Sequence, residues 1–359
     1  MEVKQKKILN ALNIALSPNT LGVLKILEKF PLPETAYNIN EENLTKLGFK
    51  QNTILNFLRI RGKTNIEKEW QKLEREDIKI ITKDENEYPE LLAEISKPPV
   101  LLYVKGELLP EEKYFSCIGT RWPSDYGKMI VPEIISDIVN YNFTVVSGMA
   151  RGIDTLSHKE ALERGKRTIA IVGTGLDIVF PPENKNLAKE IEKNGAIISE
   201  FPLQTPPLSY NFPQRNRIIA GITMGTLVIE AKEKSGALIT ANLALEENRE
   251  VFAVPGPIYS KTSKGCNNLI KQGAHPVTSS EDILSVFNIE KGLEIEKEIK
   301  GDTEEENLIL DLLKVNPCSI DEIIKKTKID TSVVNSTLIL LEIEKKIGKT
   351  GEKYYINSK

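Results

Sequence analysis

The sequence predicts an α/β protein whose parallel sheet occupies the middle of the chain, with a helical domain before it and a winged helix after it. Three observations predict this. Between residues 114 and 256, short apolar runs that mostly end in glycine alternate with helical patterns. Residues 1–70 carry leucine and isoleucine at helical spacing, and residues 304–359 combine helical patterns with a hairpin-like tail. The central alternation implies crossover helices on both faces of a parallel sheet.

The size and charge of the chain bound its organisation and its partners. With 359 residues it fits two or three domains. A net charge of −3 excludes a basic surface spread over the whole molecule, so any nucleic-acid site has to be a local patch. The three cysteines lie far apart and form neither a metal knuckle nor a disulfide framework. No apolar run reaches the roughly 18 residues of a membrane span, and we expect a cytoplasmic protein without a metal site.

The expected elements of the first two domains follow in order along the chain. Residues 1–70 form a bundle of short helices, and residues 78–106 form a bridge with one or two strands. The bridge belongs to the sheet domain, which we expect over residues 71–288. Its strand candidates are YFSCIG (114–119), FTVVSG (143–148), RTIAIVG (167–173), GAIISE (195–200), TLVIEA (226–231) and EVFAVPG (250–256). Such nearly continuous apolar strands are typical of a sheet covered on both faces.

The last part of the chain predicts a linker and a winged helix. Residues 289–303 are dense in charge and are expected to form the linker. The helix ENLILDLLK follows, and Ser319 with Glu322 makes a capping box for a second helix. Thr331 or Ser332 is expected to cap a longer third helix. The tail IGKTGEKYYI is typical of a hairpin, and together these elements indicate a winged helix.

Small and polar residues follow the first three strand candidates. Gly119 and Arg121 follow the first, Gly148 and Arg151 follow the second, and a Gly-Thr-Gly turn follows the third. The carboxyl ends of parallel strands meet at one edge of a sheet, where ligands bind near a topological switch point. Glycines let the backbone approach an anion, and each following helix adds unpaired N–H groups. We therefore expect an anion site to which the arginines contribute charge-assisted bonds.

Three later segments extend this expected site. In FPQRNRIIAG (212–221) two arginines crowd the start of a helix, where cations are unfavourable unless an anion is also present. In SGALITANLAL (235–245) a serine and a glycine precede another helix start, and the loop at 255–274 adds further polar residues. A structural alternative stays open, in which the arginines pair with Glu200 or Glu230.

Six motifs follow one another along the chain: GTRWPSDYG, SGMARGIDTLSHKEAL, FPPENKNLA, FPQRNRIIAG, SGALITA and VFAVPGPI…SKGCNNLIKQGA. In these motifs, over residues 78–285, the chain resembles the DprA/Smf family of DNA-processing proteins. The resemblance implies a Rossmann-like core that binds single-stranded DNA, forms homodimers and helps to load the RecA recombinase during DNA uptake and recombination. The residues expected to bind single-stranded DNA are Gly119, Arg121, Gly148, Arg151, Lys185, Phe212, Arg215, Asn216, Arg217, Ser235, Gly236, Thr240, Lys264 and Asn267.

The expected contacts divide into two kinds. The arginines and lysines would neutralise phosphates, which makes the affinity depend on salt. Phe212, with Tyr210 close by, is expected to stack on an unpaired base. Because a duplex hides its base faces, an aromatic residue in the site favours single strands over duplex.

A second function stays open, which is a nucleotide-binding enzyme or sensor. The core also resembles nucleotide phosphoribohydrolases, whose signature is a PGGxGTxxE turn. The segment ITMGTLVIE (222–230) keeps a Gly-Thr pair and Glu230 but lacks the Pro-Gly-Gly half. Asp154 and His158 lie four residues apart, which invites acid–base chemistry, but a local hydrogen bond on one helix is the favoured interpretation. We therefore expect no enzyme activity and no cofactor.

The terminal domains carry weaker signals. The N-terminal helices resemble, weakly, sterile-alpha-motif or helix-hairpin-helix domains. The turn in LTKLGFKQN (44–52) has a single glycine, which favours a packing role over duplex binding. The expected recognition helix of the winged helix offers Asn335 and hydroxyls but no arginine, which favours protein contact over base reading.

Overall fold

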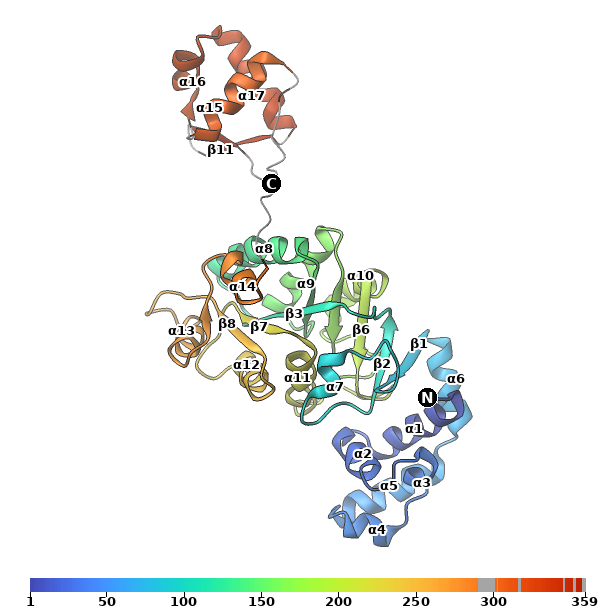
Figure 1. Cartoon of the computed structure of the whole chain (residues 1–359). Helices are drawn as coiled ribbons and strands as arrows, with labels where there is room; N and C mark the ends of the chain where they lie inside the picture. Colours follow the sequence, from blue (N-terminus) through green and yellow to red (C-terminus); the bar gives the residue numbers. More distant parts are fainter. Residues whose placement is uncertain (290–300, 302, 316–317, 345, 351–352, 357–359) are drawn as a thin grey trace. The chain divides into compact units, whose positions relative to one another are not determined.

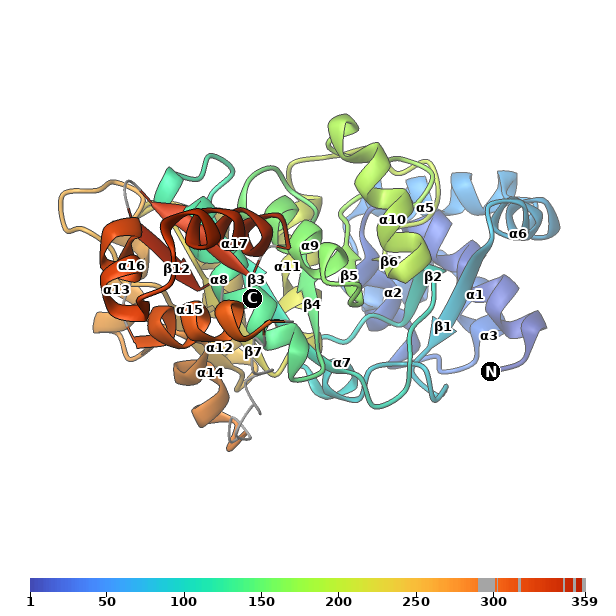
Figure 2. The same ribbon diagram turned by 90° about the horizontal axis from the view of Figure 1, so that it is seen from above.

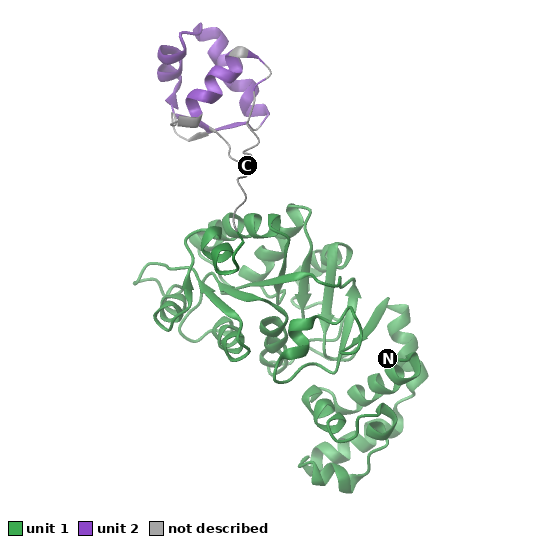
Figure 3. Cartoon of the chain, viewed as in Figure 1, with its two compact units in different colours: residues 1–289 green, residues 290–359 purple. Residues whose placement is uncertain are grey.

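The computed structural model describes residues 1–289, 301, 303–315, 318–344, 346–350 and 353–356. The chain divides into two compact units, residues 1–289 and 290–359 (Figure 3). The predicted linker at 289–303 lies largely outside the described residues.

One nine-stranded sheet forms the centre of the first unit (Figure 1). Its strands lie in the order β1-β2-β6-β5-β4-β3-β7-β8-β9. Neighbours from β6 to β9 are parallel, whereas β2 pairs antiparallel with β6, and β1 with β2. The strands are β1 Ile78–Thr82, β2 Leu101–Gly106, β3 Lys113–Ile118, β4 Phe143–Ser147, β5 Thr168–Ile171, β6 Gly195–Ser199, β7 Gly225–Val228, β8 Glu250–Ala253 and β9 His275–Pro276. The six expected strands are confirmed, the expected bridge supplies β1 and β2, and the two-residue β9 was not expected.

Helices cover both faces of this sheet. Side chains alternate along each strand, so each strand presents apolar side chains to both layers of helices. In β3, Phe115 and Cys117 pack on one face, and Tyr114 and Ile118 on the other. The first face packs against α8, α9 and α14, and the second against α7, α11, α12 and α13 (Figure 1). The helices of this part are α7 Glu90–Glu94, α8 Asp125–Asn140, α9 Ile153–Glu163, α10 Lys185–Asn194, α11 Asn211–Ile222, α12 Gly236–Glu246, α13 Lys264–Lys271 and α14 Ser280–Val286.

Six short helices precede the sheet, as the sequence predicts. They are α1 Val3–Leu16, α2 Thr20–Leu27, α3 Pro33–Tyr37, α4 Glu41–Lys46, α5 Gln51–Lys63 and α6 Ile66–Arg75. Figure 2 shows α1, α3 and α6 on the outer side of β1. Leu9 and Leu12 of α1 belong to the same hydrophobic cluster as Ala170 of β5 and Leu187 of α10. The hydrophobic core therefore crosses the domain boundary predicted near residue 70.

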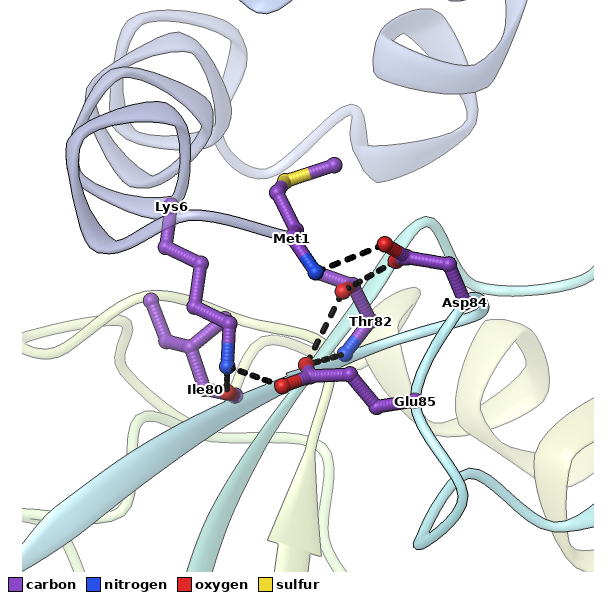
Figure 4. Close-up of polar contacts among 6 residues, drawn as sticks. All are labelled: Met1, Lys6, Ile80, Thr82, Asp84 and Glu85. Carbon is purple, nitrogen blue, oxygen red and sulfur yellow. Dashed lines mark hydrogen bonds and ion pairs between the residues drawn. The ribbon is translucent and has the colours of Figure 1, made fainter.

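A polar cluster ties α1 to the edge strand β1 (Figure 4). Lys6 Nζ donates to a backbone oxygen of β1 at 2.8 Å and forms an ion pair with Glu85 at 2.6 Å. Glu85 also accepts from the N–H of Thr82 at 2.8 Å, and the amino group of Met1 pairs with Asp84 at 2.7 Å. The hydrogen bonds from Met1 and Thr82 lower the pKa of Asp84 to about 2. This cluster and the shared core fix the N-terminal helices against the sheet.

The second unit is a winged helix, as predicted. Its elements are α15 Glu304–Val315, β10 Cys318–Ser319, α16 Ile320–Thr327, α17 Thr331–Ile343, β11 Ile347–Thr350 and β12 Lys353–Ile356, with the strands in the order β10-β12-β11. The capping box of Ser319 and Glu322 is present. The cap predicted for the third helix is wrong by one residue, because Asp330 accepts from the N–H of Ser332 at 2.8 Å.

All three cysteines are buried. No described helix is both long and apolar enough to cross a membrane. Among the described residues no group of three His, Cys, Asp or Glu side chains is arranged to hold a metal ion.

Candidate nucleic-acid interface

The loops that follow β3, β4 and β7 meet at the carboxyl edge of the sheet. The chain runs from β3 outward through β4, β5 and β6, and then returns to place β7 on the other side of β3. Such a reversal is the topological switch point at which open α/β sheets bind ligands. A cavity of about 540 Å³ opens there, lined by residues of the loops 118–122 and 232–236 and by the first half of α11.

Arg215 of α11 lines this cavity and joins two neighbouring strand ends. It is buried, and its Nη1 donates to the carbonyl oxygens of Gly148, at 2.9 Å, and of Ile171. Burial lowers the pKa of Arg215 to about 10, a shift that the carboxylate of Asp154 opposes. The guanidinium therefore stays charged at neutral pH and places a positive charge inside the cavity.

Asp154 lies near Arg215 in the first turn of α9. Its Oδ2 accepts from the N–H groups of Gly148, at 3.1 Å, and of Ala150, at 3.4 Å. Burial raises its pKa, and the neighbouring guanidinium opposes that shift. The predicted hydrogen bond between Asp154 and His158 is wrong, because the Nδ1 of His158 lies 2.7 Å from the hydroxyl of Thr168 instead. Asp154 organises the turn after β4 rather than acting as half of an acid–base pair.

Aromatic side chains form part of the cavity wall. The rings of Phe212 and Phe180 are 5.7 Å apart and tilted by 39°. A Cβ at Gly173 would come within 3.2 Å of the Phe212 ring, so the glycine allows the ring to lie close to the backbone. Trp122 lines the same cavity and is 74% exposed. Tyr210 is half exposed, but it does not line the cavity.

Cations line the open side of the cavity. Arg121, Lys232 and Lys234 are exposed, and within residues 1–289 none of them forms an ion pair. Ser235 caps α12 by accepting from an N–H at 3.3 Å, and a Cβ at Gly236 would meet nothing within 4 Å. The wall therefore combines free positive charge with a helix N-terminus that is open to an anion.

The structure brings most of the sequence-predicted site residues together. Those that line the cavity are Gly119, Arg121, Phe212, Arg215, Asn216, Ser235, Gly236 and Thr240. Gly148 lies against Arg215, because a Cβ at Gly148 would come within 2.7 Å of its guanidinium.

Other predicted residues have protein partners or lie elsewhere. Arg217 is buried and forms an ion pair with Glu200 at 2.5 Å, as the structural alternative proposes. Arg151 forms an ion pair with Glu183. Lys185 is exposed at the start of α10 and does not line the cavity.

The two predicted residues of the 255–274 segment also lie outside the cavity. Lys264 forms an exposed ion pair with Glu233 at 3.8 Å. Asn267 donates to the carbonyl oxygen of Gly256 at 2.9 Å and accepts from its N–H at 3.2 Å. The amide of Asn267 therefore fixes the loop that follows β8.

The sequence prediction missed four aromatic or cationic residues of the cavity lining: Trp122, Phe180, Lys232 and Lys234. Three of them carry a signal that was available, since Trp122 directly follows Arg121 and the two lysines follow the β7 strand. The position of Phe180 depends on the loop after β5, which no spacing rule predicts.

Glu230, the glutamate of the phosphoribohydrolase-like segment, does not line this cavity. It is buried, and its carboxylate accepts from the N–H and the hydroxyl of Ser124, at 2.8 and 2.7 Å, and from the hydroxyl of Thr262 at 2.8 Å. Its carboxylate thus joins the loop before α8 to the loop after β8.

The fold and the cavity define a class of protein: an α/β protein with a cationic, aromatic-lined cleft at the switch point of its sheet, followed by a winged helix. Residues 79–288 match the family model of DNA recombination-mediator protein A, and residues 296–350 match the DprA winged helix domain. The chain belongs to the DprA/Smf family of DNA-processing proteins, as the motifs predict.

Relatives and solved structures agree with this family membership. The chain is 38% identical to Protein Smf of Synechocystis over 73% of this chain and 67% of that protein. It is 45% identical to DNA processing protein DprA of Streptococcus pneumoniae over 56% of this chain and 71% of that protein. The crystal structure of the Streptococcus pneumoniae DprA matches with a TM-score of 0.67 at 36% identity, covering 77% of this chain and 95% of that one. The structure of DNA processing protein A from Helicobacter pylori, which was reported for its single-stranded DNA binding mode, matches with a TM-score of 0.52 at 25% identity. The match covers 58% of this chain and 96% of that one.

Proposed function

We propose that this protein binds single-stranded DNA in the cavity at the carboxyl ends of β3, β4 and β7 and acts as a recombination mediator. The observation that carries the proposal is the combination of unpaired cations with aromatic rings in one open cleft. Arg121, Lys232 and Lys234 face solvent without a carboxylate partner among residues 1–289, and Trp122 and Phe212 line the same cavity. Cations neutralise the phosphates of a nucleic acid, and aromatic rings stack on its unpaired bases.

The exposed and the buried cations of the cavity are expected to have different roles. Arg121 and the two lysines are exposed and are expected to neutralise backbone phosphates. Arg215 is buried and already donates to two carbonyl oxygens, so it supports the cavity with fixed charge. The N-terminus of α12 at Gly236 offers backbone N–H groups to a further phosphate.

The test is a titration of a fluorescent oligodeoxythymidine followed by anisotropy at several salt concentrations, with a duplex of equal length beside it. We expect the single strand to bind more tightly, and Arg121→Ala to reduce the slope of log K against log salt by about 0.7, the value for one phosphate contact on a single strand. The matched control is Arg75→Ala, an exposed arginine at the end of α6 beside the edge strand β1. A preference for duplex at equal salt would contradict the proposal.

A nucleotide-binding enzyme or sensor is the second candidate. Glu230, the glutamate of the phosphoribohydrolase-like segment, accepts three hydrogen bonds from Ser124 and Thr262. This supports a protein without catalytic activity. Calorimetric titration with a panel of nucleoside monophosphates and diphosphates separates the two candidates, since the enzyme or sensor requires heat of binding and the DNA-binding protein does not.

We propose the role in RecA loading, the homodimer and the location of the protein from its family. The matched family is described as a recombination mediator, which supports loading of RecA onto the bound strand. Action as a homodimer and a cytoplasmic location are proposed from the resemblance to the family alone. Sedimentation velocity tests the homodimer. RecA filament assembly on single-stranded DNA, timed with and without this protein, tests the loading.

The winged helix is proposed to contact protein rather than DNA bases. Its α17 exposes Val333, Leu340 and Ile343, which lie on one side of the helix at positions i, i+7 and i+10. An apolar outer face does not read base edges. Ile343→Glu is therefore expected to leave the affinity for single-stranded DNA unchanged in the anisotropy assay.

A further inference from the structure

A buried ion pair connects the N-terminal helices to the helix that carries the FPQRNR motif. Arg217 of α11 is 7% exposed, Glu200 is 4% exposed, and Arg217 Nη2 donates to Glu200 Oε1 at 2.5 Å. The other carboxylate oxygen of Glu200 accepts from the hydroxyl of Thr20, at the start of α2, at 2.8 Å. The backbone oxygen of Glu200 accepts from the side chain of Asn13 of α1 at 3.0 Å. Glu200 is thus held by α1, α2 and α11 together.

The guanidinium of Arg217 depends on this carboxylate. Its Nε and Nη1 are buried and have no hydrogen-bond partner among the described residues. A buried arginine that loses its carboxylate partner leaves an uncompensated charge, which is strongly destabilising. The hydrogen bond from Thr20 helps to fix the carboxylate of Glu200. That carboxylate in turn fixes Arg217, and with it this part of α11.

The same helix presents its other residues to the cavity. Phe212, Arg215, Asn216 and Ile219 line the cavity, whereas Arg217 does not. An α-helix moves as a stiff unit over two or three turns, so a displacement at Arg217 is carried to its neighbours on the cavity side. Arg217 therefore affects the cavity through the position of α11 and not by direct contact.

We propose that Arg217 is a positioning residue: Thr20, Glu200 and Arg217 hold α11 at the orientation in which Phe212 and Asn216 face the cavity. By this route the N-terminal helices set the affinity for single-stranded DNA without touching the strand. The inference rests on the proposed function, because it concerns the affinity of the same cavity.

The experiment compares Thr20→Val with Thr20→Ser in the full chain, using fluorescent oligodeoxythymidine and anisotropy. Thr20→Val removes the hydroxyl at nearly constant volume, whereas Thr20→Ser keeps the hydroxyl. We expect Thr20→Val to bind about three- to tenfold more weakly and Thr20→Ser to bind like the wild type. The slope of log K against log salt should stay unchanged in both, because no phosphate contact is lost. The matched control is Thr45→Val on α4, whose hydroxyl donates to a backbone oxygen of its own helix.

A double-mutant cycle separates positioning from a general loss of stability. Thr20→Val combined with Phe212→Ala should be non-additive in binding free energy, because both act through α11. Thr20→Val combined with Arg121→Ala should be additive, since Arg121 is on the loop after β3. Thermal unfolding of each variant ensures that binding is measured on folded protein, and if Thr20→Val does not fold, Arg217→Lys is measured in its place, with weaker binding at unchanged slope expected.

The outcomes distinguish the two levels of the proposal. If the wild type does not bind the single strand, the proposed function fails. If the wild type binds and Thr20→Val binds equally well, or loses salt dependence as Arg121→Ala does, the positioning role fails while the DNA-binding function stands.

Discussion

The guanidinium of Arg215 lies directly against the backbone of Gly148, so closely that a Cβ at Gly148 would come within 2.7 Å of its Nη1 and Nη2. The carbonyl oxygen of Gly148 accepts from the same guanidinium at 2.9 Å. A glycine at this strand end thus places a fixed positive charge inside the cavity, and the two positions cannot vary independently.

Gly148→Ala is expected to displace Arg215 and weaken binding of single-stranded DNA. The added methyl group forces the guanidinium away from its carbonyl acceptor, and overpacking of this kind costs about 1–3 kcal/mol of the free energy of unfolding. Urea unfolding and anisotropy measure the two effects. The control is Gly62→Ala in α5, where a Cβ would meet nothing within 4 Å. That change should stabilise the helix by about 0.5–1 kcal/mol and leave binding unaltered. If the Gly148→Ala variant binds single-stranded DNA as tightly as the wild type, binding does not depend on the position of the Arg215 guanidinium.

Phe212→Leu is expected to weaken binding without changing its salt dependence. The substitution keeps an apolar side chain but removes the flat ring, and a stacked base is worth about 1–3 kcal/mol. An oligonucleotide with abasic sites provides the readout. The wild type should lose affinity for it relative to oligodeoxythymidine, and the variant should discriminate less between the two. Phe30→Leu, on a partly buried ring of the N-terminal helices, is the control. If the variant still discriminates as the wild type does, Phe212 is not the stacking platform.

The sheet could be predicted from the sequence because its strands are apolar on both faces and end in glycine. Six strands and the winged helix follow from these local patterns. The strand order and the antiparallel attachment of β1 and β2 do not, since pairing between distant segments leaves no periodic trace. The hydrophobic core shared by Leu9 and Ala170 escaped prediction for the same reason.

The cavity could be predicted where a residue immediately follows a strand, as Arg121 does. Arg217 marks the limit of that reasoning. It stands two residues from Arg215 in one motif, and 3.6 residues per turn place the two on different sides of α11. The sequence alone leaves open which of them faces the cavity, and only the position of Glu200 decides it.

The paired change Lys232→Ala and Lys234→Ala is expected to reduce the salt dependence of binding. Both lysines line the cavity without an ion pair among residues 1–289, and each phosphate contact contributes about 0.7 to the slope on a single strand. The double variant should therefore lose up to about 1.4 in slope. Lys68→Ala with Lys159→Ala removes the same net charge from exposed positions on α6 and α9. An equal loss of slope in this control would mean that overall charge, rather than the cavity, governs binding.

The buried His158 is expected to make the fold less stable as the pH falls below about 6.5, the ordinary pKa of histidine. Burial, with help from the nearby charge of Arg215, lowers its pKa to about 3. The sign follows from linkage: between these two pKa values the unfolded chain binds a proton that the folded chain does not, so acid favours unfolding. The contribution is fully present above pH 6.5, falls by about 1.4 kcal/mol for each pH unit below it, and levels off near the folded pKa. Urea unfolding at pH 7 and pH 5.5 should therefore show a loss about 1 kcal/mol larger in the wild type than in His158→Gln, which cannot titrate there. This window lies above the range in which ordinary carboxylates titrate. Every ionisable group other than His158 is the same in the two proteins, so the difference between them reports on His158. If the two proteins lose stability in parallel, His158 is protonated in the folded state, and the environment that α9 gives it is more polar than its contacts indicate.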